Sequence, residues 1–465
     1  MSSRWIALSA ASLLVGLAVV PAGASGAEPG DRVAELRHDF IEATSPAGHF
    51  DADGTHRPSP SRNVSEVGSN DLGGGGFNSD VWALDKHAYV GTWGLFTEEG
   101  LFCPNDGTKV IDISDPTDPE MVNTLPTEPG TQTNDVKLAS VNSPHFRGDL
   151  LAVSNEDCAA PGARGFELWD VSNPADASPL GRYGPPQAFD VPSDLVEWGF
   201  GVHNVFIFEQ GRRDYVAAVV DFGEAFQLIF GAPLKGDLRI VDVTDPTAPV
   251  EVADWGIAKD LGLDPFAGQG DDFSFSFLHD VWVENGIAYL SYWDAGLILL
   301  DVSDPTDPQF ISRTPYAPTE EGNTHVAVPA RGGTLVITGD EDFTPGPWGF
   351  MRVFDTSDIT APVEIGTFAT ENALNAPPPG GDFSAHNVVV RGNTAYFSWY
   401  SDGIRLVDIS QPTVPREIGS FVPEPAADPF GILPTAPEVW GVYVQNQLIL
   451  ASDMNSGLHI LRAVP

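Results

Sequence analysis

Four of the ten histidines stand in similar sequence surroundings, each at the start of an apolar run that predicts a β-strand. They are His203 in VHNV, His279 in LHDV, His325 in THVA and His386 in AHNV. Neutral imidazole nitrogens are ligands that iron, copper and zinc accept in proteins. These four side chains are therefore candidate ligands of a divalent metal, provided that the fold brings them together.

Acidic residues recur where the second strand of each repeat is expected to end, on the same side of the fold as the histidines. They are Glu156, Asp157, Asp221, Asp294, Glu341, Asp342, Asp402 and Asp453. Carboxylates of this kind can orient metal-bound imidazoles, join them as ligands, or bind a different ligand. Calcium is a further candidate ion, although the sequence contains no spaced calcium-loop motif.

A purely structural role for the histidines stays open beside the metal. A histidine at a fixed repeat position can hydrogen-bond a neighbouring turn, and repetition of the unit would then explain its recurrence. Alignment of the repeats also places Thr324, not His325, in the position of His279, and strand alternation would aim His325 in another direction. Three other repeats carry different residues at this position, namely Ser79, Asn134 and Trp440.

A recurring phrase indicates the elements that position these residues. A strand ending in aspartate, followed by a turn rich in proline, returns as VIDISDPTDP (Val110–Pro119), LWDVSNPADA (Leu168–Ala177), IVDVTDPTAP (Ile240–Pro249), LLDVSDPTDP (Leu299–Pro308), VFDTSDITAP (Val353–Pro362) and LVDISQPTVP (Leu406–Pro415). Proline cannot donate to a strand ladder, so each turn must lie between strands. Two strands precede each phrase and one follows it, which is typical of a β-propeller blade of roughly 40 residues or more.

We predict an all-β fold, a seven-bladed β-propeller of four-stranded antiparallel blades, over residues 62–465. The repeats are Asp80–Pro126, Asn134–Tyr183, His203–Trp255, His279–Thr314, Thr324–Phe368, His386–Phe421 and Trp440–Ala463. The seventh repeat lacks a fourth strand of its own. Because Asn63–Gly68 (NVSEVG) is similar to the fourth strand Arg416–Gly419 (REIG), we expect a strand at about Asn63–Gly68 to close the last blade and leave no open sheet edge.

The third-strand phrase resembles that of the LVIVD-repeat family of secreted propellers, and it survives here as Arg405–Ile409 (RLVDI) and Arg239–Val243 (RIVDV). The resemblance implies the propeller fold and brings no agreed activity. The expected histidine arrangement is also similar in outline to two groups of propeller enzymes. The carotenoid-cleaving dioxygenases hold iron on four histidines from different blades, and the selenium-binding-protein group of thiol oxidases is linked to copper. Both likenesses are of architecture only.

The N-terminal residues and the charge set the expected compartment and exclude some partners. Residues 1–27 read as a secretory signal peptide and residues 28–61 as a flexible leader, so we expect a protein secreted to the extracellular or periplasmic space, with no membrane insertion after cleavage. Lys and Arg number 23 against 65 Asp and Glu, a net charge of −42. Such a charge argues against nucleic acid as a partner, because phosphate binding needs clustered cations.

Strand order predicts that the long connections gather on one face. The tight first-to-second turns and the short proline turns open on the same face, because strands alternate in direction. Longer loops, such as Asp221–Gly236 with its aromatic stretch Phe226–Phe230, then lie on the opposite face with the histidines, where function tends to sit. The only cysteines, Cys103 and Cys158, fall in equivalent loops of the first two repeats, which predicts a disulfide between them.

Two functions remain open at this point. The first is a secreted, monomeric binding protein whose loop-rich face holds a small molecule, a glycan or a protein. The second is a metal-dependent (Fe, Cu or Zn) oxidase, oxygenase or hydrolase that uses the histidine cluster at the mouth of the central channel. Aromatic residues on strand positions, among them Trp293 and Tyr400, are interpreted as packing between blades.

Overall fold

The computed structural model describes residues 61–74, 77–97, 100–103, 106–158, 164–185, 201–268, 275–317, 320, 322–342, 348–374, 381–427 and 435–464. The predicted signal peptide and leader lie outside these residues, apart from Ser61. No helix in the described ranges is long and apolar enough to cross a membrane.

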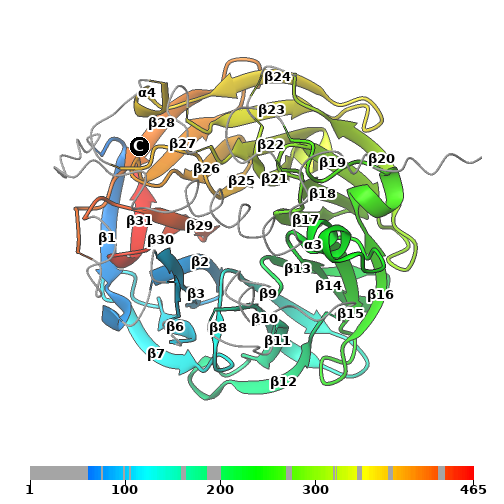
Figure 1. The fold of residues 1–465 in the computed structure, drawn as a ribbon. Helices are drawn as coiled ribbons and strands as arrows, with labels where there is room; N and C mark the ends of the chain where they lie inside the picture. Colours follow the sequence, from blue (N-terminus) through cyan, green and yellow to red (C-terminus); the bar gives the residue numbers. More distant parts are fainter. Residues whose placement is uncertain are drawn as a thin grey trace, which may run out of the picture.

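Seven four-stranded antiparallel sheets stand around a central axis, as the sequence predicts (Figure 1). From the axis outward, the first blade consists of β2 (Phe77–Leu84), β3 (His87–Trp93), β6 (Thr108–Asp112) and β7 (Glu120–Leu125), the second of β9 (Val136–Asn142), β10 (Arg147–Asp157), β11 (Gly165–Asp170) and β12 (Ser178–Tyr183), and the third of β13 (Val205–Gln210), β14 (Arg213–Val219), β15 (Leu238–Asp242) and β16 (Val250–Trp255). The fourth blade consists of β17 (Asp280–Glu284), β18 (Ile287–Ser291), β19 (Leu297–Asp301) and β20 (Gln309–Thr314), and the fifth of β21 (Thr324–Ala330), β22 (Leu335–Asp340), β23 (Met351–Asp355) and β24 (Val363–Phe368). The sixth blade consists of β25 (Val388–Arg391), β26 (Thr394–Ser398), β27 (Ile404–Asp408) and β28 (Arg416–Phe421), and the last of β29 (Val439–Gln445), β30 (Leu448–Asp453), β31 (Gly457–Ala463) and β1 (Val64–Asn70).

The inner strands are apolar on both faces because each blade is covered by a blade on either side. In β15, for example, Leu238 and Ile240 lie on one face of the sheet and Val241 on the other, and all three are buried. Strands that are buried on both faces read as continuous hydrophobic runs. The fourth strands form the outer rim, where Val250 and Val363 are each 58% exposed. The repeated third-strand phrase is therefore the core of each blade.

The aspartate that ends each third strand caps the turn that follows it. Asp301 Oδ1 accepts a hydrogen bond from the backbone N–H of Ser303 at 2.9 Å, and Asp408 Oδ1 does the same for Ser410 at 2.8 Å. This backbone hydrogen bond helps to hold the pKa of the Asp408 carboxyl below its ordinary value. These aspartates lie on the tight-turn face and stabilise the turns.

β1 pairs antiparallel with β31 as the outer strand of the last sheet, with Val64 opposite Ala463 and Asn70 opposite Leu458. The register shifts between Glu66 and Gly68, as it does between the third and fourth strands of the other blades. His459 Nδ1 lies 2.7 Å from Glu66 Oε1. A buried arginine paired with a partly exposed glutamate occupies the equivalent place in three other blades, namely Arg239–Glu251, Arg352–Glu364 and Arg405–Glu417.

A glycine of β1 also receives the turn of the neighbouring blade. A Cβ atom on Gly68 would lie 2.5 Å from the carbonyl oxygen of Pro116 in the first blade. The fourth-strand glycines Gly181 and Gly366 approach the next turn in the same way. β1 thus has the contacts of a fourth strand. That it holds the ring closed remains a prediction.

Short elements occupy the connections. A hairpin of β4 (Leu95–Thr97) and β5 (Gly100–Phe102) precedes β6, and β8 (Thr131–Gln132) extends the second sheet. The connection Asp221–Gly236, expected as a loop, contains helix α3 (Gly223–Phe230). The remaining short elements are η1 (Leu72–Gly74), η2 (Pro174–Asp176), the π-helical turn η4 (Ile257–Leu261), η5 (Arg331–Gly333) and α4 (Glu371–Leu374).

Candidate metal centre

Three of the four candidate histidines occupy the same place in their blades. His203, His279 and His386 lie one or two residues before the innermost strands β13, β17 and β25. Each donates its backbone N–H to a carbonyl at the end of the second strand, at 2.9, 2.8 and 3.0 Å. The strand ladder therefore fixes the backbone at all three positions.

The fourth histidine reaches the same place by a β-bulge. In β21, Thr324 pairs with Asp340 and Val326 with Gly339, so His325 is an extra residue without an opposite partner. A bulge rotates the chain locally and re-aims one side chain. The alternation of a regular strand would have turned His325 away from His279. Instead their ring centroids are 3.9 Å apart.

The four imidazoles form one continuous row. His203 Nε2 lies 3.1 Å from His279 Nε2, and the rings of His325 and His386 are 4.2 Å apart between centroids. All four side chains are buried, with exposures between 2% and 8%. Nitrogen atoms about 3–4 Å apart are spaced as two ligands of one ion, given metal–nitrogen bonds of about 2 Å.

In His203 and His386, Nδ1 faces a hydrogen-bond acceptor outside the row, so Nε2 points toward the row. His203 Nδ1 lies 2.9 Å from Glu156 Oε1, and His386 Nδ1 lies 2.6 Å from the carbonyl oxygen of Trp440. A metal-bound histidine almost always donates its second N–H in this manner. His325 Nδ1 is buried without a hydrogen-bond partner. The donor set of imidazole nitrogens fits a transition metal.

The protonation of the row is uneven. Burial lowers the pKa of His279 and His325 well below the ordinary value and lowers that of His386 to about 3. Burial alone would lower the pKa of His203 as well, but the Glu156 and Asp221 carboxylates raise it to about 9. Three imidazoles are thus neutral, the form in which nitrogen binds a metal.

Three of the eight candidate carboxylates join the histidines. Glu156 and Asp221 lie beside His203, with Asp221 Oδ2 at 4.0 Å from its Nδ1. Glu341 lies on the other side of the row, 3.6 Å from His325 Nε2 and 3.7 Å from His386 Nε2. Two groups among the described residues, His279–His325–Glu341 and Glu156–His203–Asp221, have ligand atoms within 4.8 Å of one another. Neither group contains all four histidines, so a single ion bound by the four would draw their nitrogen atoms closer together.

The other five candidate carboxylates have different partners. Asp157 pairs with Arg164, and Asp402 pairs with Arg405 at 2.9 Å. Asp294 accepts the N–H of Asn323, Asp453 caps the turn at Asn455, and the backbone of Asp342 bonds Ser384. None of these named contacts is to an imidazole. These contacts are those of turn and loop stabilisation.

Two aromatic residues interpreted as packing between blades lie against the histidines. Trp293 lies 5.5 Å from His279 and Tyr400 lies 4.8 Å from His386, between ring centroids. Both have positive φ, 39° and 34°, which is strained for bulky side chains. Such strain persists where the surrounding structure imposes it and clusters at functional sites. The sequence does not indicate this positive φ, because neither residue is a glycine or an asparagine, the types that commonly adopt it.

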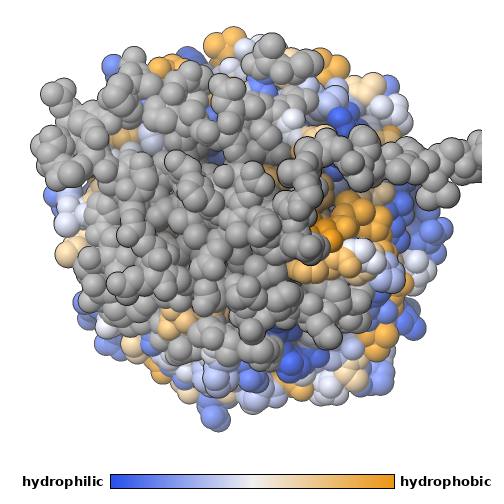
Figure 2. Space-filling view, viewed as in Figure 1, coloured by the Kyte–Doolittle hydropathy of each residue, from blue (hydrophilic) through white to orange (hydrophobic). Residues whose placement is uncertain are grey.

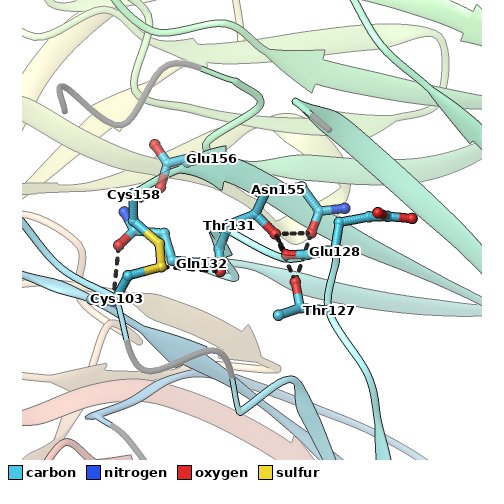
Figure 3. The surroundings of a disulfide bond; sticks show 9 residues. Cys103, Thr127, Glu128, Thr131, Gln132, Asn155, Glu156 and Cys158 are labelled. Carbon is cyan, nitrogen blue, oxygen red and sulfur yellow. Dashed lines mark hydrogen bonds between the residues drawn. A yellow bond between two sulfur atoms is a disulfide. The ribbon is translucent and has the colours of Figure 1, made fainter. Parts of the chain in front are cut away.

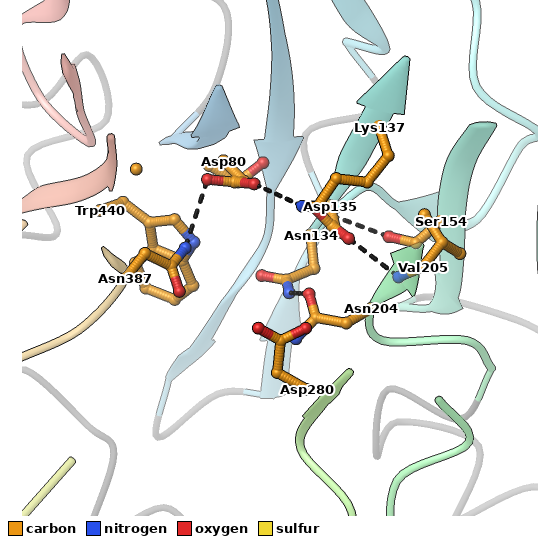
Figure 4. Close-up of polar contacts among 12 residues, drawn as sticks. Asp80, Asn134, Asp135, Lys137, Ser154, Asn204, Val205, Asp280, Asn387 and Trp440 are labelled. Atoms are coloured by element: carbon orange, nitrogen blue, oxygen red, sulfur yellow. Dashed lines mark hydrogen bonds and ion pairs between the residues drawn. The ribbon is translucent and has the colours of Figure 1, made fainter. Parts of the chain in front are cut away.

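A buried polar layer lies next to the histidines along the inner strands (Figure 4). Lys137 Nζ contacts both Asp80, at 2.9 Å, and Asp135. Asn387 donates to the Asp80 carboxylate at 3.2 Å. Burial raises the pKa of Asp280 to about 6, although Lys137 opposes that shift. The layer ties blades across the axis through one cation and several carboxylates.

Aromatic side chains follow farther along the same strands. Trp82 and Trp282 lie 6.1 Å apart, Tyr443 packs 4.3 Å from Trp82, and Phe206 packs 4.7 Å from Trp282, between ring centroids. Apolar rings of four different blades therefore meet across the axis. We infer that a ligand reaches the histidines from the opposite, loop-rich side.

The face seen in Figure 1 is that loop-rich side, since α3 lies in front of the ring. Figure 2 shows a hydrophobic area on this face near the place of α3, where Leu228 is 39% exposed. Beneath it, Phe222 stacks on Phe277 at 4.0 Å and Phe277 on Trp293 at 4.9 Å. An aromatic stack thus runs from α3 to the ring that packs on His279.

The predicted disulfide between Cys103 and Cys158 is confirmed, with Cα atoms 5.4 Å apart (Figure 3). It joins the connection before β6 in the first blade to the end of β10 in the second. The Cys158 N–H also donates to Gly130 O at 2.8 Å. The bridge lies on the loop-rich side, since Glu156, two residues before Cys158, contacts His203.

Comparisons with known proteins identify the repeat. The LVIVD repeat model matches residues 104–127, 232–255, 278–314 and 382–422. No curated protein sequence matches the chain. Among solved structures, the computationally designed Ika8 protein is similar over 85% of this chain and 98% of its own, at 9% identity and a TM-score of 0.44. The β-propeller domain of Myceliophteria thermophila Cps50 (Swd1) is similar over 84% of this chain and 98% of its own, at 12% identity and a TM-score of 0.49.

Proposed function

We propose that this chain, a seven-bladed propeller with LVIVD repeats, binds a divalent transition metal on His203, His279, His325 and His386 and acts as a metal-dependent oxidase or oxygenase. The observation that carries the proposal is the row of four buried imidazoles, with two nitrogens 3.1 Å apart. A structural role would explain one histidine per turn. It does not explain why four imidazoles from successive blades contact one another.

Coordination number favours redox chemistry over hydrolysis. Zinc with four protein ligands is saturated in its usual tetrahedral geometry, and a catalytic zinc keeps one position open. Iron and copper accept additional ligands, so four imidazoles can leave room for dioxygen or a substrate. When bound, such an ion would supply one-electron redox chemistry and activation of oxygen. The chain would supply neutral nitrogen donors, with Glu156 and the Trp440 carbonyl orienting two of them.

The neighbouring side chains favour a small apolar or planar substrate. Trp293, Phe277 and Phe222 form a stack on one side of the row, and Tyr400 and Trp440 pack on His386 at the other. Ligand sites are typically lined by aromatic side chains with a few polar groups. We also propose that the protein works outside the cytoplasm. The disulfide supports that location, because disulfides persist in oxidising compartments.

Metal titration tests the proposed function. Protein treated with a chelator and then dialysed is titrated with Fe(II), Cu(II) and Zn(II), and one high-affinity ion per chain is expected. The double variant His279→Ala/His386→Ala is expected to lose this site. The control His145→Ala, whose side chain is 58% exposed and lies beside Asp245, is expected to keep it. A folded wild type that takes up no ion contradicts the metal centre and leaves the non-catalytic binding protein as the function.

A further inference from the structure

We infer that Glu341 is an additional ligand of the metal and that Tyr400 is the positioning residue that holds its carboxylate in place. The inference rests on the proposed function, because it concerns the ligand set of the same ion. It assigns a role to a tyrosine that the repeat pattern alone would give to packing.

The spacing of Glu341 is that of a ligand and not of a hydrogen-bond partner. Its Oε2 lies 3.6 Å from His325 Nε2 and its Oε1 lies 3.7 Å from His386 Nε2. Both separations exceed the 2.7–3.2 Å of a typical N–H···O hydrogen bond. Two ligands at about 2.1 Å from one ion stand roughly 3–4 Å apart, depending on the angle between them. One carboxylate therefore faces two imidazole nitrogens at separations that an ion could bridge.

Glu341 has a fixed location beside the row. It directly follows β22, it is 6% exposed, and its backbone N–H donates to Asn323 O at 2.9 Å. The Glu341 carboxylate contacts His325, His386 and Tyr400, none of which is a permanent cation, so its burial carries a large desolvation cost. A divalent cation at the row would offset that cost.

The phenol of Tyr400 donates a hydrogen bond to Glu341 Oε1. Tyr400 belongs to the sixth blade and Glu341 to the fifth, so this bond spans two blades beside the row. A ligating carboxylate is usually hydrogen-bonded on its outer side, which fixes its direction and tunes its basicity. Tyr400 is placed to do this for Glu341, since its ring packs 4.8 Å from His386.

The backbone at Tyr400 is strained in a way that serves this contact. Its φ of 34° is costly for an aromatic residue. The carbonyl of Tyr400 accepts the N–H of Val439 at 3.2 Å, which bridges to the next blade. The strain is thus imposed by an interblade contact, and it directs the phenol toward the carboxylate.

The equivalent residue in the fourth blade, Trp293, carries no hydroxyl. Trp293 has nearly the same backbone, with φ of 39°, and bridges to Thr324 of the fifth blade. It packs on His279 as Tyr400 packs on His386. The same position therefore carries an indole in one blade and a phenol in the other. The phenol occurs beside the carboxylate.

A carboxylate ligand would also alter which ion is preferred. Four imidazoles alone suit iron, copper and zinc, whereas an added anionic oxygen favours harder ions such as Fe(II) and Mn(II) over Cu(I). The added negative charge partly balances a dication in a buried site. We expect Fe(II) or Mn(II) to bind more tightly relative to Cu(I) in the wild type than in a variant without the carboxylate.

Cobalt(II) titration of the full chain tests this inference. Co(II) reports its own coordination through its visible absorption bands, and a competing chelator gives its affinity. Glu341→Gln and Tyr400→Phe are each expected to weaken binding by about 10–100-fold, and Glu341→Gln is expected to shift the absorption bands. The control Tyr183→Phe also removes a phenol that donates to a glutamate, Glu251, and is expected to change neither. Should Glu341→Gln fail to fold, Glu341→Asp is the second variant, because it keeps the charge but shortens the side chain by one methylene. It is expected to weaken Co(II) binding and to shift the Co(II) absorption bands.

The outcomes separate this inference from the proposed function. Wild-type binding with unchanged affinity and spectrum in Glu341→Gln overturns the role of Glu341 and leaves the histidine centre standing. Loss in Glu341→Gln but not in Tyr400→Phe overturns the role of Tyr400 alone. A wild type that binds no Co(II) contradicts the metal centre itself.

Discussion

Substitution of Gly68 by alanine probes whether β1 seats as the fourth strand of the last blade. The added Cβ would lie 2.5 Å from Pro116 O and 2.9 Å from the Thr117 carbonyl carbon, both backbone atoms. Contacts between such atoms are normally near 3.5 Å, so β1 or the turn must move by about 1 Å. The φ of Gly68 is not in the positive range, so steric overlap is the only cost.

The size of the effect follows from overpacking. Extra methyl groups in a well-packed contact typically cost about 1–3 kcal/mol. For a propeller of roughly 400 residues, the unfolding entropy of about 2.1 cal/mol/K per residue converts this to a fall in Tm of about 1–4 °C. Gly181→Ala is the matched control, because its Cβ would lie 2.4 Å from Pro246 O in a blade whose strands are continuous in sequence.

Thermal unfolding and amide hydrogen exchange measure the result. We expect Gly68→Ala and Gly181→Ala to destabilise the protein to a similar extent, because the added methyl group meets a backbone carbonyl at nearly the same distance in both. We also expect faster exchange for the amides of β31 that pair with β1. If Gly181→Ala lowers Tm while Gly68→Ala leaves both Tm and exchange unchanged, the assignment of β1 as the closing strand is refuted.

Two other predictions concern stability. Reduction of the Cys103–Cys158 disulfide, or its replacement by two serines, removes a link between residues 55 positions apart. In the chain-entropy model this loss lowers the free energy of unfolding by about 4 kcal/mol, which corresponds to a fall in Tm of about 5 °C. Equal Tm values with and without reductant would contradict this prediction. Burial raises the pKa of Asp237 to about 7 and that of Glu224 to about 8. Because the folded state binds these protons more tightly than the unfolded state, the stabilisation is present at low pH and is lost as the pH rises toward 7–8, with a slope of up to about 1.4 kcal/mol per pH unit for each group. Asp237→Asn should flatten the fall in Tm between pH 5.5 and 8.5, and an undiminished fall would show that other groups cause it.

The sequence predicts the fold well because its repeated signals are local. Each third strand is a continuous apolar run that ends in a capping aspartate, and both features follow from burial between blades and from turn chemistry. The likeness of Asn63–Gly68 to a fourth strand rests on the same kind of signal. Helix α3 is different. Its Gly223–Phe230 segment has neither a side-chain cap nor an extended apolar period, so it reads as a loop.

The candidate site is only partly predictable, because its geometry depends on single-residue irregularities. His203, His279 and His386 share one strand position and can be grouped from sequence. His325 joins them through a bulge, and one extra residue in a strand leaves no periodic signature. The direction of the Tyr400 side chain is likewise not predictable from sequence, because a strained backbone and a contact to another blade set it.

The central claim is that the four imidazoles hold one metal ion. X-ray diffraction from crystals of iron- or copper-loaded protein, recorded at the absorption edge of the metal, locates the ion directly. We expect one anomalous peak at the mouth of the channel, about 2 Å from imidazole nitrogens of His203, His279, His325 and His386. A loaded crystal without a peak there, in which His203 and His279 remain 3.1 Å apart and hydrogen-bonded to each other, would contradict the account.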